Sequence, residues 1–123
     1  MRFTLGLFLA LALFRVEAAE LLSVTEVATI IDTDAAPLIL DVRSEVEFSS
    51  GRVPGAVNIP FDQITARVSE LEPYRNQALI VYCHSGRRAD IAITSLEGLG
   101  FSRLLHMDGD YLGWQAAGLS EDK

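Results

Sequence analysis

The segment from Cys83 to Arg88, Cys-His-Ser-Gly-Arg-Arg, holds the only cysteine of the chain and contains the residues best suited to chemistry. Cys83 directly follows the apolar run 78–82, which predicts that its thiol lies at the end of a buried strand. Residues 88–99 have the pattern of a helix, so the loop between strand and helix would direct backbone N–H groups and the positive helix end at the sulfur. Such a loop stabilises a thiolate or a bound oxyanion, and it therefore predicts nucleophilic catalysis by Cys83.

The alternative interpretation of Cys83 is structural, because free cysteines usually pack as small hydrophobic residues. The residues that follow favour the catalytic interpretation, since five of the next six are polar, charged or glycine. Gly86 can adopt the positive φ that a tight loop around an anion requires. Arg87 and Arg88 add positive charge to the same loop, which indicates an anionic substrate or leaving group.

The two histidines and the tryptophan are weaker candidates for chemistry. His84 and His106, together with one cysteine, provide neither the ligand number nor the spacing of a zinc site, so we expect no metal and no cofactor. His106 lies within an apolar stretch and is expected to be a core histidine with satisfied hydrogen bonds. Trp114 is expected to pack in the core.

Residues 1–18 have the outline of a secretory signal peptide, with a short positive start, an apolar stretch over 3–14 and small residues before the expected cleavage after Ala18. The apolar stretch is too short for a permanent anchor, so we expect no stable membrane insertion after cleavage. This predicts a protein exported to the periplasm and one domain over residues 19–123. A single cysteine in an oxidising compartment has no internal partner, which also favours a reactive thiol.

The charge of the chain limits its possible partners. The net charge is −7, and removal of residues 1–18 takes away Arg2, Arg15 and Glu17, which leaves −8. No basic run or aromatic-basic stripe occurs in the sequence, which counts against nucleic acid as a partner. Any anionic substrate must therefore be bound locally, by the Cys83 loop.

Strand and helix patterns alternate along residues 19–123. A capping-box pattern, Ser23-Val24-Thr25-Glu26, predicts a helix to Ile31, and Ser44 can cap a second, short helix. The predicted strands are 38–40, 56–59, 78–82 and 104–107, and the remaining helices are 44–48, 61–71, 88–99 and 111–117. Gly100 and Pro73 are expected to end helices. This alternation predicts an α/β fold with a parallel sheet, and ligands of such sheets bind at the carboxyl ends of the strands.

Several charged or reactive residues fall at those predicted carboxyl ends. Cys83, the segment Asp41–Arg43 and Asp108 each follow a predicted strand, so we expect them at one edge of the sheet. Four stretches of the sequence, 40–48, 51–60, 81–88 and 108–118, also resemble the rhodanese homology domain in order and spacing. Exported single-domain thiosulfate sulfurtransferases of the phage-shock type are similar in size and signal peptide. The resemblance implies a rhodanese-like, five-stranded parallel sheet with helices on both faces.

The resemblance also implies a reaction. A thiosulfate sulfurtransferase takes a sulfane sulfur from a small anionic donor such as thiosulfate, holds it as a cysteine persulfide, and passes it to cyanide or a thiol. In this chain Cys83 would be the nucleophile and sulfur carrier, and Asp41 and Arg43 would support the site structurally. The residues implied in substrate binding, through backbone N–H groups and the two guanidinium groups, are His84, Ser85, Gly86, Arg87 and Arg88.

Three residues depart from the pattern of the family. Arg52 stands where histidine is common, Ala89 where serine or threonine is common, and Asp110 in place of the second glycine of a Gly-Gly pair. We expect Asp110 to add negative charge close to the rim of the site. None of these departures removes the nucleophile.

Two other functions are alternatives to sulfur transfer by an enzyme. A phosphatase or arsenate reductase of the dual-specificity type also uses a cysteine in an anion-binding loop, but its loop has five residues between cysteine and arginine. Here only four residues separate Cys83 from Arg88, which fits a smaller sulfur atom. The second alternative is a non-catalytic persulfide carrier or thiol sensor that serves an exported partner protein, and its loop would look the same.

Overall fold

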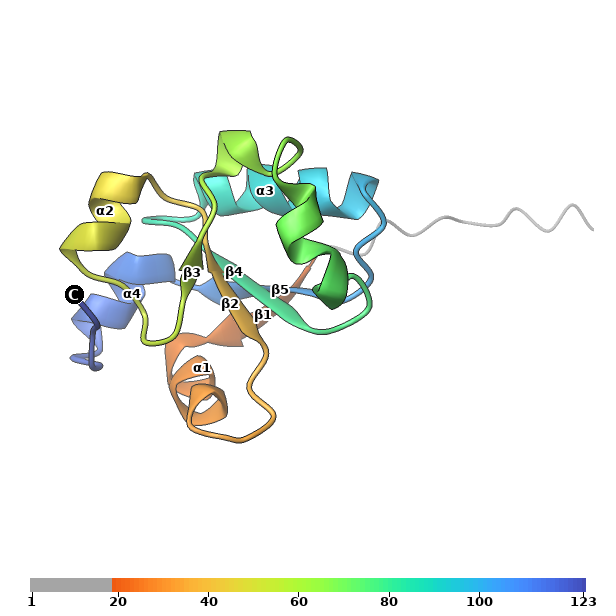
Figure 1. Ribbon diagram of the computed structural model, residues 1–123. Helices are drawn as coiled ribbons and strands as arrows, with labels where there is room; N and C mark the ends of the chain where they lie inside the picture. The colour runs from red at the N-terminus through yellow and green to blue at the C-terminus, as the bar shows by residue number, and fades with distance from the viewer. Residues whose placement is uncertain (1–18) are drawn as a thin grey trace, which may run out of the picture.

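A computed structural model describes residues 19–123 of the protein, and the predicted signal peptide, residues 1–18, lies outside the described residues. The centre of the fold is a five-stranded parallel sheet with the strand order β1-β5-β4-β2-β3 (Figure 1). The strands are β1 (Glu20–Ser23), β2 (Leu38–Asp41), β3 (Val57–Asn58), β4 (Leu79–Tyr82) and β5 (Leu104–Asp108). The α/β class and the five-stranded parallel sheet are therefore confirmed.

Strand β4 occupies the middle of the sheet because its four residues are apolar or aromatic and all are buried. Successive side chains of a strand point to opposite faces of the sheet. Leu79 and Val81 accordingly pack in the core on one face, whereas Ile80 and Tyr82 pack in the core on the other. A strand buried on both faces is typical of parallel sheets covered by helices.

Helices cover both faces of the sheet (Figure 1). One face carries α3 (Arg87–Gly98) with the 310 helices η1 (Phe61–Gln63) and η2 (Val68–Tyr74), and the other carries α1 (Val24–Ile31) and α4 (Asp110–Ala116). The short helix α2 (Glu45–Ser50) lies at the carboxyl end of the sheet, beside α4. Trp114 of α4 is 1% exposed, which confirms the prediction that it packs in the core.

The predicted helix ends are confirmed by their hydrogen bonds. The side chain of Ser23 accepts the backbone N–H of Glu26, and Ser44 forms a complete capping box with Glu47. These bonds satisfy N–H groups that have no partner inside a helix. Gly100 follows α3 with a φ of +91°, a left-handed conformation that ends helices and favours glycine.

The region after β3 differs from the prediction. A single helix over residues 61–71, ended by Pro73, was expected; the structure instead has two 310 helices, and Pro73 lies inside the second. The apolar residues Ile64 and Leu71 are buried as the helical spacing predicts. Steps of three and four residues suit both helix types, so the spacing alone does not distinguish them.

Strand β1 was implied by the family resemblance but has no clear signal in the sequence. It is a short edge strand that pairs with β5, and Leu21 in its middle is 59% exposed. A short edge strand shows little of the regular alternation that predicts strands. Its position beside β5 follows from tertiary pairing.

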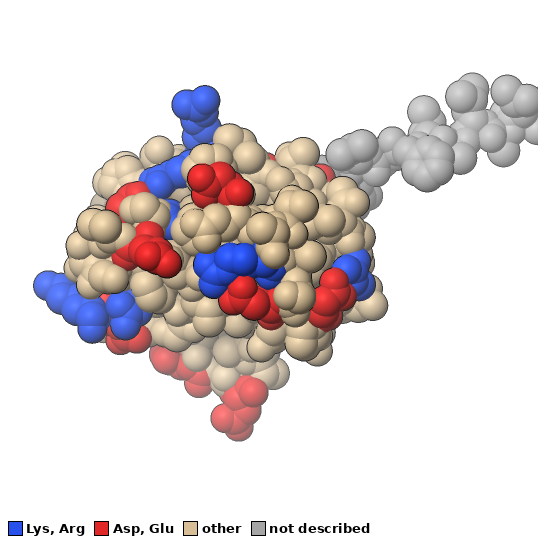
Figure 2. Space-filling view, turned by 45° about the horizontal axis from the view of Figure 1, so that its top comes forward, with Lys and Arg blue, Asp and Glu red and all other residues tan. Residues whose placement is uncertain are grey.

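The surface carries both signs of charge. On the face shown in Figure 2, acidic and basic side chains lie next to one another among uncharged atoms. Two ion pairs lie in the 310 region, Arg67–Glu70 and Arg75–Glu72. Over residues 19–123, no helix combines the length and the apolar character that crossing a membrane requires.

Candidate active site

The Cys83 thiol lies at the carboxyl end of β4, under a tight loop that leads into α3. The backbone N–H of Gly86 donates to Sγ of Cys83 at 3.0 Å, and α3 begins at the next residue, Arg87. Cys83 is 1% exposed, so the loop itself covers the sulfur. Gly86 has a φ of +123°, a conformation that side chains rarely allow, which is the property predicted for it.

Helix α4 holds this loop from below. The N–H of Tyr111 donates to the carbonyl oxygen of Cys83 at 3.0 Å, and the N–H of Leu112 donates to that of His84 at 3.1 Å. The loop carbonyls thus bind N–H groups in the first turn of α4, which have no partner inside that helix. These bonds fix the loop backbone, in which the N–H of Gly86 donates to Sγ.

The other predicted substrate-binding residues differ in exposure. His84, Ser85 and Arg87 are exposed at the surface of the loop. Arg88 is 28% exposed and extends to α2, where its guanidinium forms a bidentate ion pair with Glu47, with N–O distances of 2.7 and 3.0 Å. The two arginines therefore have different surroundings, although they are adjacent in sequence.

Glu47 is a site residue that the sequence did not indicate in this role. Its carboxylate belongs to the capping box of α2 and binds Arg88 at the same time. The hydrogen bond from Arg88 lowers the pKa of Glu47 from 4.5 to about 2, and the bonds with Ser44 act in the same direction. Glu47 is thus ionised at neutral pH, and it neutralises much of the charge that Arg88 would offer an anion.

Asp41 and Arg43 form a buried ion pair at the end of β2. Their closest N–O distance is 2.6 Å, and their side chains are 0% and 3% exposed. Asp41 also accepts the hydroxyl of Tyr82 at 2.6 Å, while Arg43 donates to the carbonyl oxygen of Gly51 and lies 4.2 Å over the ring of Tyr111. The pair thus joins β2, β4 and α4, and its role in supporting the site stays a prediction.

Asp110 lies deeper than expected. It was expected to add negative charge close to the rim of the site, but the residue is 2% exposed and its carboxylate lies beneath the loop. Its Oδ1 accepts the backbone N–H of Cys83 at 2.9 Å. The positive φ of Gly109 and Asp110, +90° and +53°, explains why glycine is common at both positions, and aspartate is one of the residues that tolerates this conformation.

The side chain of His106 is 12% exposed, and its Nε2 has hydrogen-bond partners as predicted, whereas its Nδ1 has an ion-pair partner only. Its Nε2 lies 3.0 and 3.1 Å from the two carboxylate oxygens of Asp110, and its Nδ1 lies 3.5 Å from Asp90. The hydrogen bond with Asp110 raises the pKa of His106 above 6.5, and the charges of Asp110, Asp90 and Asp108 add to this effect. Within residues 19–123, no three His, Cys, Asp or Glu side chains form a group suited to a metal ion.

The other two departures from the family pattern lie outside the loop. The guanidinium of Arg52 stacks on Phe48 at 4.5 Å, and the backbone of Arg52 pairs with Asp122 near the C-terminus. Ala89 is fully buried in the core on the α3 side of the sheet. Neither side chain forms a hydrogen bond with Sγ of Cys83.

Comparison with known proteins identifies the family of the chain. The rhodanese-like domain family matches residues 23–117, and the chain belongs to this family. A sulfurtransferase from Allochromatium vinosum is 33% identical over 82 residues, which cover 67% of this chain and 75% of that protein. The thiosulfate sulfurtransferase PspE from Escherichia coli is 31% identical over 70 residues, covering 57% of this chain and 67% of that protein.

A solved structure shows the same architecture. The thiosulfate sulfurtransferase from Pseudomonas aeruginosa superimposes with a TM-score of 0.75 at 28% identity, and the match covers 85% of this chain but 20% of that one. The chain also spans less than half the length of two further curated relatives, 44% and 46%. The family thus defines this protein as a rhodanese-like sulfur-handling domain, which also occurs as one part of longer proteins.

Proposed function

We propose that this protein is a sulfurtransferase in which Cys83 accepts a sulfane sulfur and passes it to a thiol or to cyanide. The observation that carries the proposal is the Gly86 N–H bond to Sγ of Cys83, at the N-terminal end of a helix of 12 residues. Aligned N–H groups and the positive helix end favour an anion there. The short loop, with four residues between Cys83 and Arg88, suits a single sulfur atom bonded to Cys83 better than a larger oxyanion.

The proposed cycle has two displacements at sulfur. The Cys83 thiolate attacks the outer sulfur of a donor such as thiosulfate, a new S–S bond forms, and sulfite leaves with the electron pair of the broken S–S bond. The terminal sulfur of the persulfide then transfers to cyanide or a thiolate, and the electron pair of its bond to Sγ restores the Cys83 thiolate. The loop N–H groups would stabilise the anionic sulfur between these steps.

The Glu47–Arg88 ion pair supports a second candidate, the persulfide carrier. A dianionic donor gains most from an arginine whose charge is free, and here Arg88 is already bound by a carboxylate at 2.7 Å. A carrier that receives sulfur from a partner's persulfide does not depend on this charge. The two candidates share Cys83 chemistry and differ in turnover with free thiosulfate.

The test of the proposed function is intact-mass spectrometry of the protein before and after incubation with thiosulfate. We expect a gain of one sulfur, about 32 Da, that cyanide or a thiol reverses. Turnover of thiosulfate with cyanide identifies an enzyme, whereas a stable persulfide without turnover identifies a carrier. If no sulfur is gained from thiosulfate or from a persulfide donor, the proposal is wrong.

Replacement of Arg88 by alanine is expected to raise the thiosulfate KM about threefold with a smaller change in kcat, because Glu47 neutralises only part of the charge that Arg88 can offer the donor. The measurement is steady-state kinetics with thiosulfate as the varied substrate. Arg87→Ala is the matched comparison, and we expect a smaller increase because the charge of the exposed Arg87 is screened by water. An unchanged KM in Arg88→Ala would exclude Arg88 from donor binding.

A further inference from the structure

A buried carboxylate lies directly beneath the Cys83 loop. Oδ1 of Asp110 accepts the N–H of Cys83 at 2.9 Å, and its Oδ2 would lie 3.1 Å from a Cβ placed on Gly86. Gly86 is also the residue whose N–H donates to Sγ of Cys83. The same short loop therefore separates two groups that are both anionic in the reactive state, the Asp110 carboxylate and the Cys83 sulfur.

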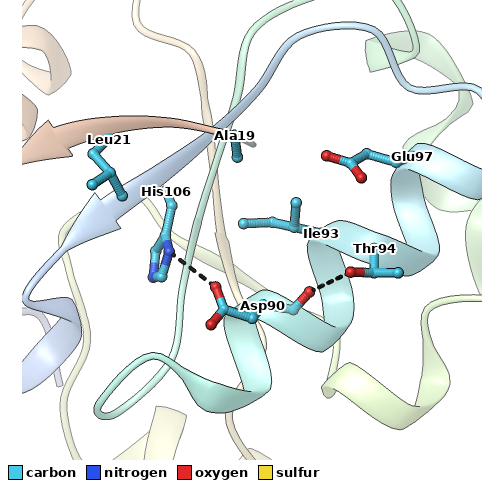
Figure 3. Close-up of a pocket in the computed structure, with 7 residues that line it drawn as sticks. All are labelled: Ala19, Leu21, Asp90, Ile93, Thr94, Glu97 and His106. Atoms are coloured by element: carbon cyan, nitrogen blue, oxygen red, sulfur yellow. Dashed lines mark hydrogen bonds and ion pairs between the residues drawn. The ribbon is translucent and has the colours of Figure 1, made fainter. Parts of the chain in front are cut away.

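His106 is the only described side chain with a nitrogen within hydrogen-bond distance of the Asp110 carboxylate. Its Nε2 faces both oxygens of Asp110. Its Nδ1 faces Asp90 of α3, and the dashed line in Figure 3 marks this contact. Neutral imidazole has one N–H, whereas the imidazolium ion has two. Carboxylates on both sides of the ring therefore favour the cation, and they also raise the pKa of His106.

The remaining surroundings of His106 are acidic or apolar. On its own strand Asp108 contributes negative charge, and Glu97 of α3 lines the same surface cavity of about 410 Å³ (Figure 3). Its neighbours in the sheet are Leu21 of β1 and Val81 of β4. Asp90 is 76% exposed, so water screens its charge. The buried partner, Asp110 at 3% side-chain exposure, is thus the main group to which the imidazole couples.

We propose that His106 and Asp110 are positioning residues of the sulfur site, in which the carboxylate fixes the Cys83 loop and the imidazolium cancels the charge that would otherwise repel the sulfur anion. The inference rests on the proposed role of Cys83 as the nucleophile. An ionised Asp110 without a counter-ion disfavours a second negative charge nearby. Protonated His106 removes this penalty, so the reactivity of Cys83 becomes linked to the protonation of His106.

The expected pH dependence follows from the direction of the His106 shift. Below the raised pKa of His106, the His106–Asp110 pair has no net charge, and a negative sulfur at Cys83 is favoured. Above this pKa, His106 is neutral and the charge of Asp110 is not balanced. Replacing His106 by asparagine removes the cation at every pH. The difference between wild type and His106→Asn is therefore largest in mildly acidic solution and disappears as the pH rises.

The experiment measures the rate of alkylation of Cys83 by iodoacetamide between pH 5.5 and 9, on full-length wild type, His106→Asn, and His106→Asn with Asp110→Asn. Asp110→Asn retains an oxygen that can accept the Cys83 N–H but has no charge. We expect His106→Asn to react about tenfold more slowly at about pH 6 and equally fast at high pH, and a tenfold difference in rate corresponds to about 1.4 kcal/mol. The double variant is expected to recover to within about twofold of wild type.

Three results would overturn the inference: equal rates at about pH 6, a decrease in His106→Asn that is the same at every pH, or a double variant as slow as the single one. Asp34→Asn, at an exposed loop residue, is added to His106→Asn as the control for the change in net charge that Asp110→Asn makes. Because alkylation requires no sulfur transfer, this inference can fail while the proposed function stands, and the reverse.

A second measurement uses the wild-type sequence, in case His106→Asn does not fold. Cys83, the only thiol, is converted either with iodoacetate to a negative adduct or with iodoacetamide to a neutral adduct of similar size. Coupling between two sites is reciprocal, so the charge at Cys83 must act on His106. We expect NMR titration to give a higher pKa for His106 in the negative adduct. The same pKa in both adducts would overturn the inference.

Discussion

Cys83→Ser is expected to abolish sulfur transfer, with no gain of mass from thiosulfate and a loss of turnover of at least about 10³-fold. Removing a covalent nucleophile causes losses of this order or larger in other enzymes. Serine preserves the shape of the side chain and can accept the Gly86 N–H that Sγ accepts at 3.0 Å, so the loop should keep its conformation. A hydroxyl, however, neither ionises near neutral pH nor holds a sulfane sulfur.

The measurements for Cys83→Ser are the mass after thiosulfate treatment and the rate of thiocyanate formation. Because the chain has a single cysteine, any sulfur gained by the wild type as a persulfide is bound to Cys83. Equal urea midpoints for the two proteins would show that the lost activity is chemical. Full sulfur transfer by Cys83→Ser would exclude Cys83 as the carrier.

Arg43→Met is expected to lower the free energy of unfolding by about 3–5 kcal/mol, because it leaves the fully buried Asp41 carboxylate without its counter-ion. The variant also loses the bond to the carbonyl oxygen of Gly51 and the contact over Tyr111. A loss of this size is a large part of the 5–15 kcal/mol that stabilises a typical domain. Urea unfolding followed by circular dichroism measures it.

A double variant separates the charge from the packing. Asp41→Asn combined with Arg43→Met removes the buried charge, while the amide oxygen can still accept the hydroxyl of Tyr82. We expect this double variant to be more stable than Arg43→Met alone. Arg67→Met is the matched control, since Arg67 pairs with Glu70 at the surface, and it should leave the urea midpoint unchanged. A midpoint for Arg43→Met equal to that of wild type would contradict the prediction.

The positions of most elements follow from the sequence because their signals are local. Ser23 and Ser44 each precede a glutamate by three residues, which is the spacing of a capping bond within one helical turn. The run 78–82 is continuously apolar, and a short strand covered on both faces buries residues 79–82 of it. The position of Cys83 after this strand therefore determines that its thiol lies at the carboxyl edge of the sheet.

Contacts between distant segments account for what the sequence did not reveal. Glu47 and Arg88 are 41 residues apart, so nothing in the local pattern shows that one neutralises the other. Strand β1 is recognisable only through its pairing with β5. The choice between an α-helix and 310 helices over 61–74 depends on packing against the sheet, because the same apolar spacing suits both.

Asp110 shows what depends on the sequence and what depends on the tertiary structure. The sequence by itself determined that an aspartate stands at position 110 close to the site, and it determined the candidate nucleophile, the loop and the order of most elements. Only the tertiary structure decided that this aspartate turns inward, binds the N–H of Cys83 and pairs with His106. The physical reason is that side-chain direction and charge balance depend on which groups the fold brings together, whereas strands, caps and turns depend on neighbours along the chain.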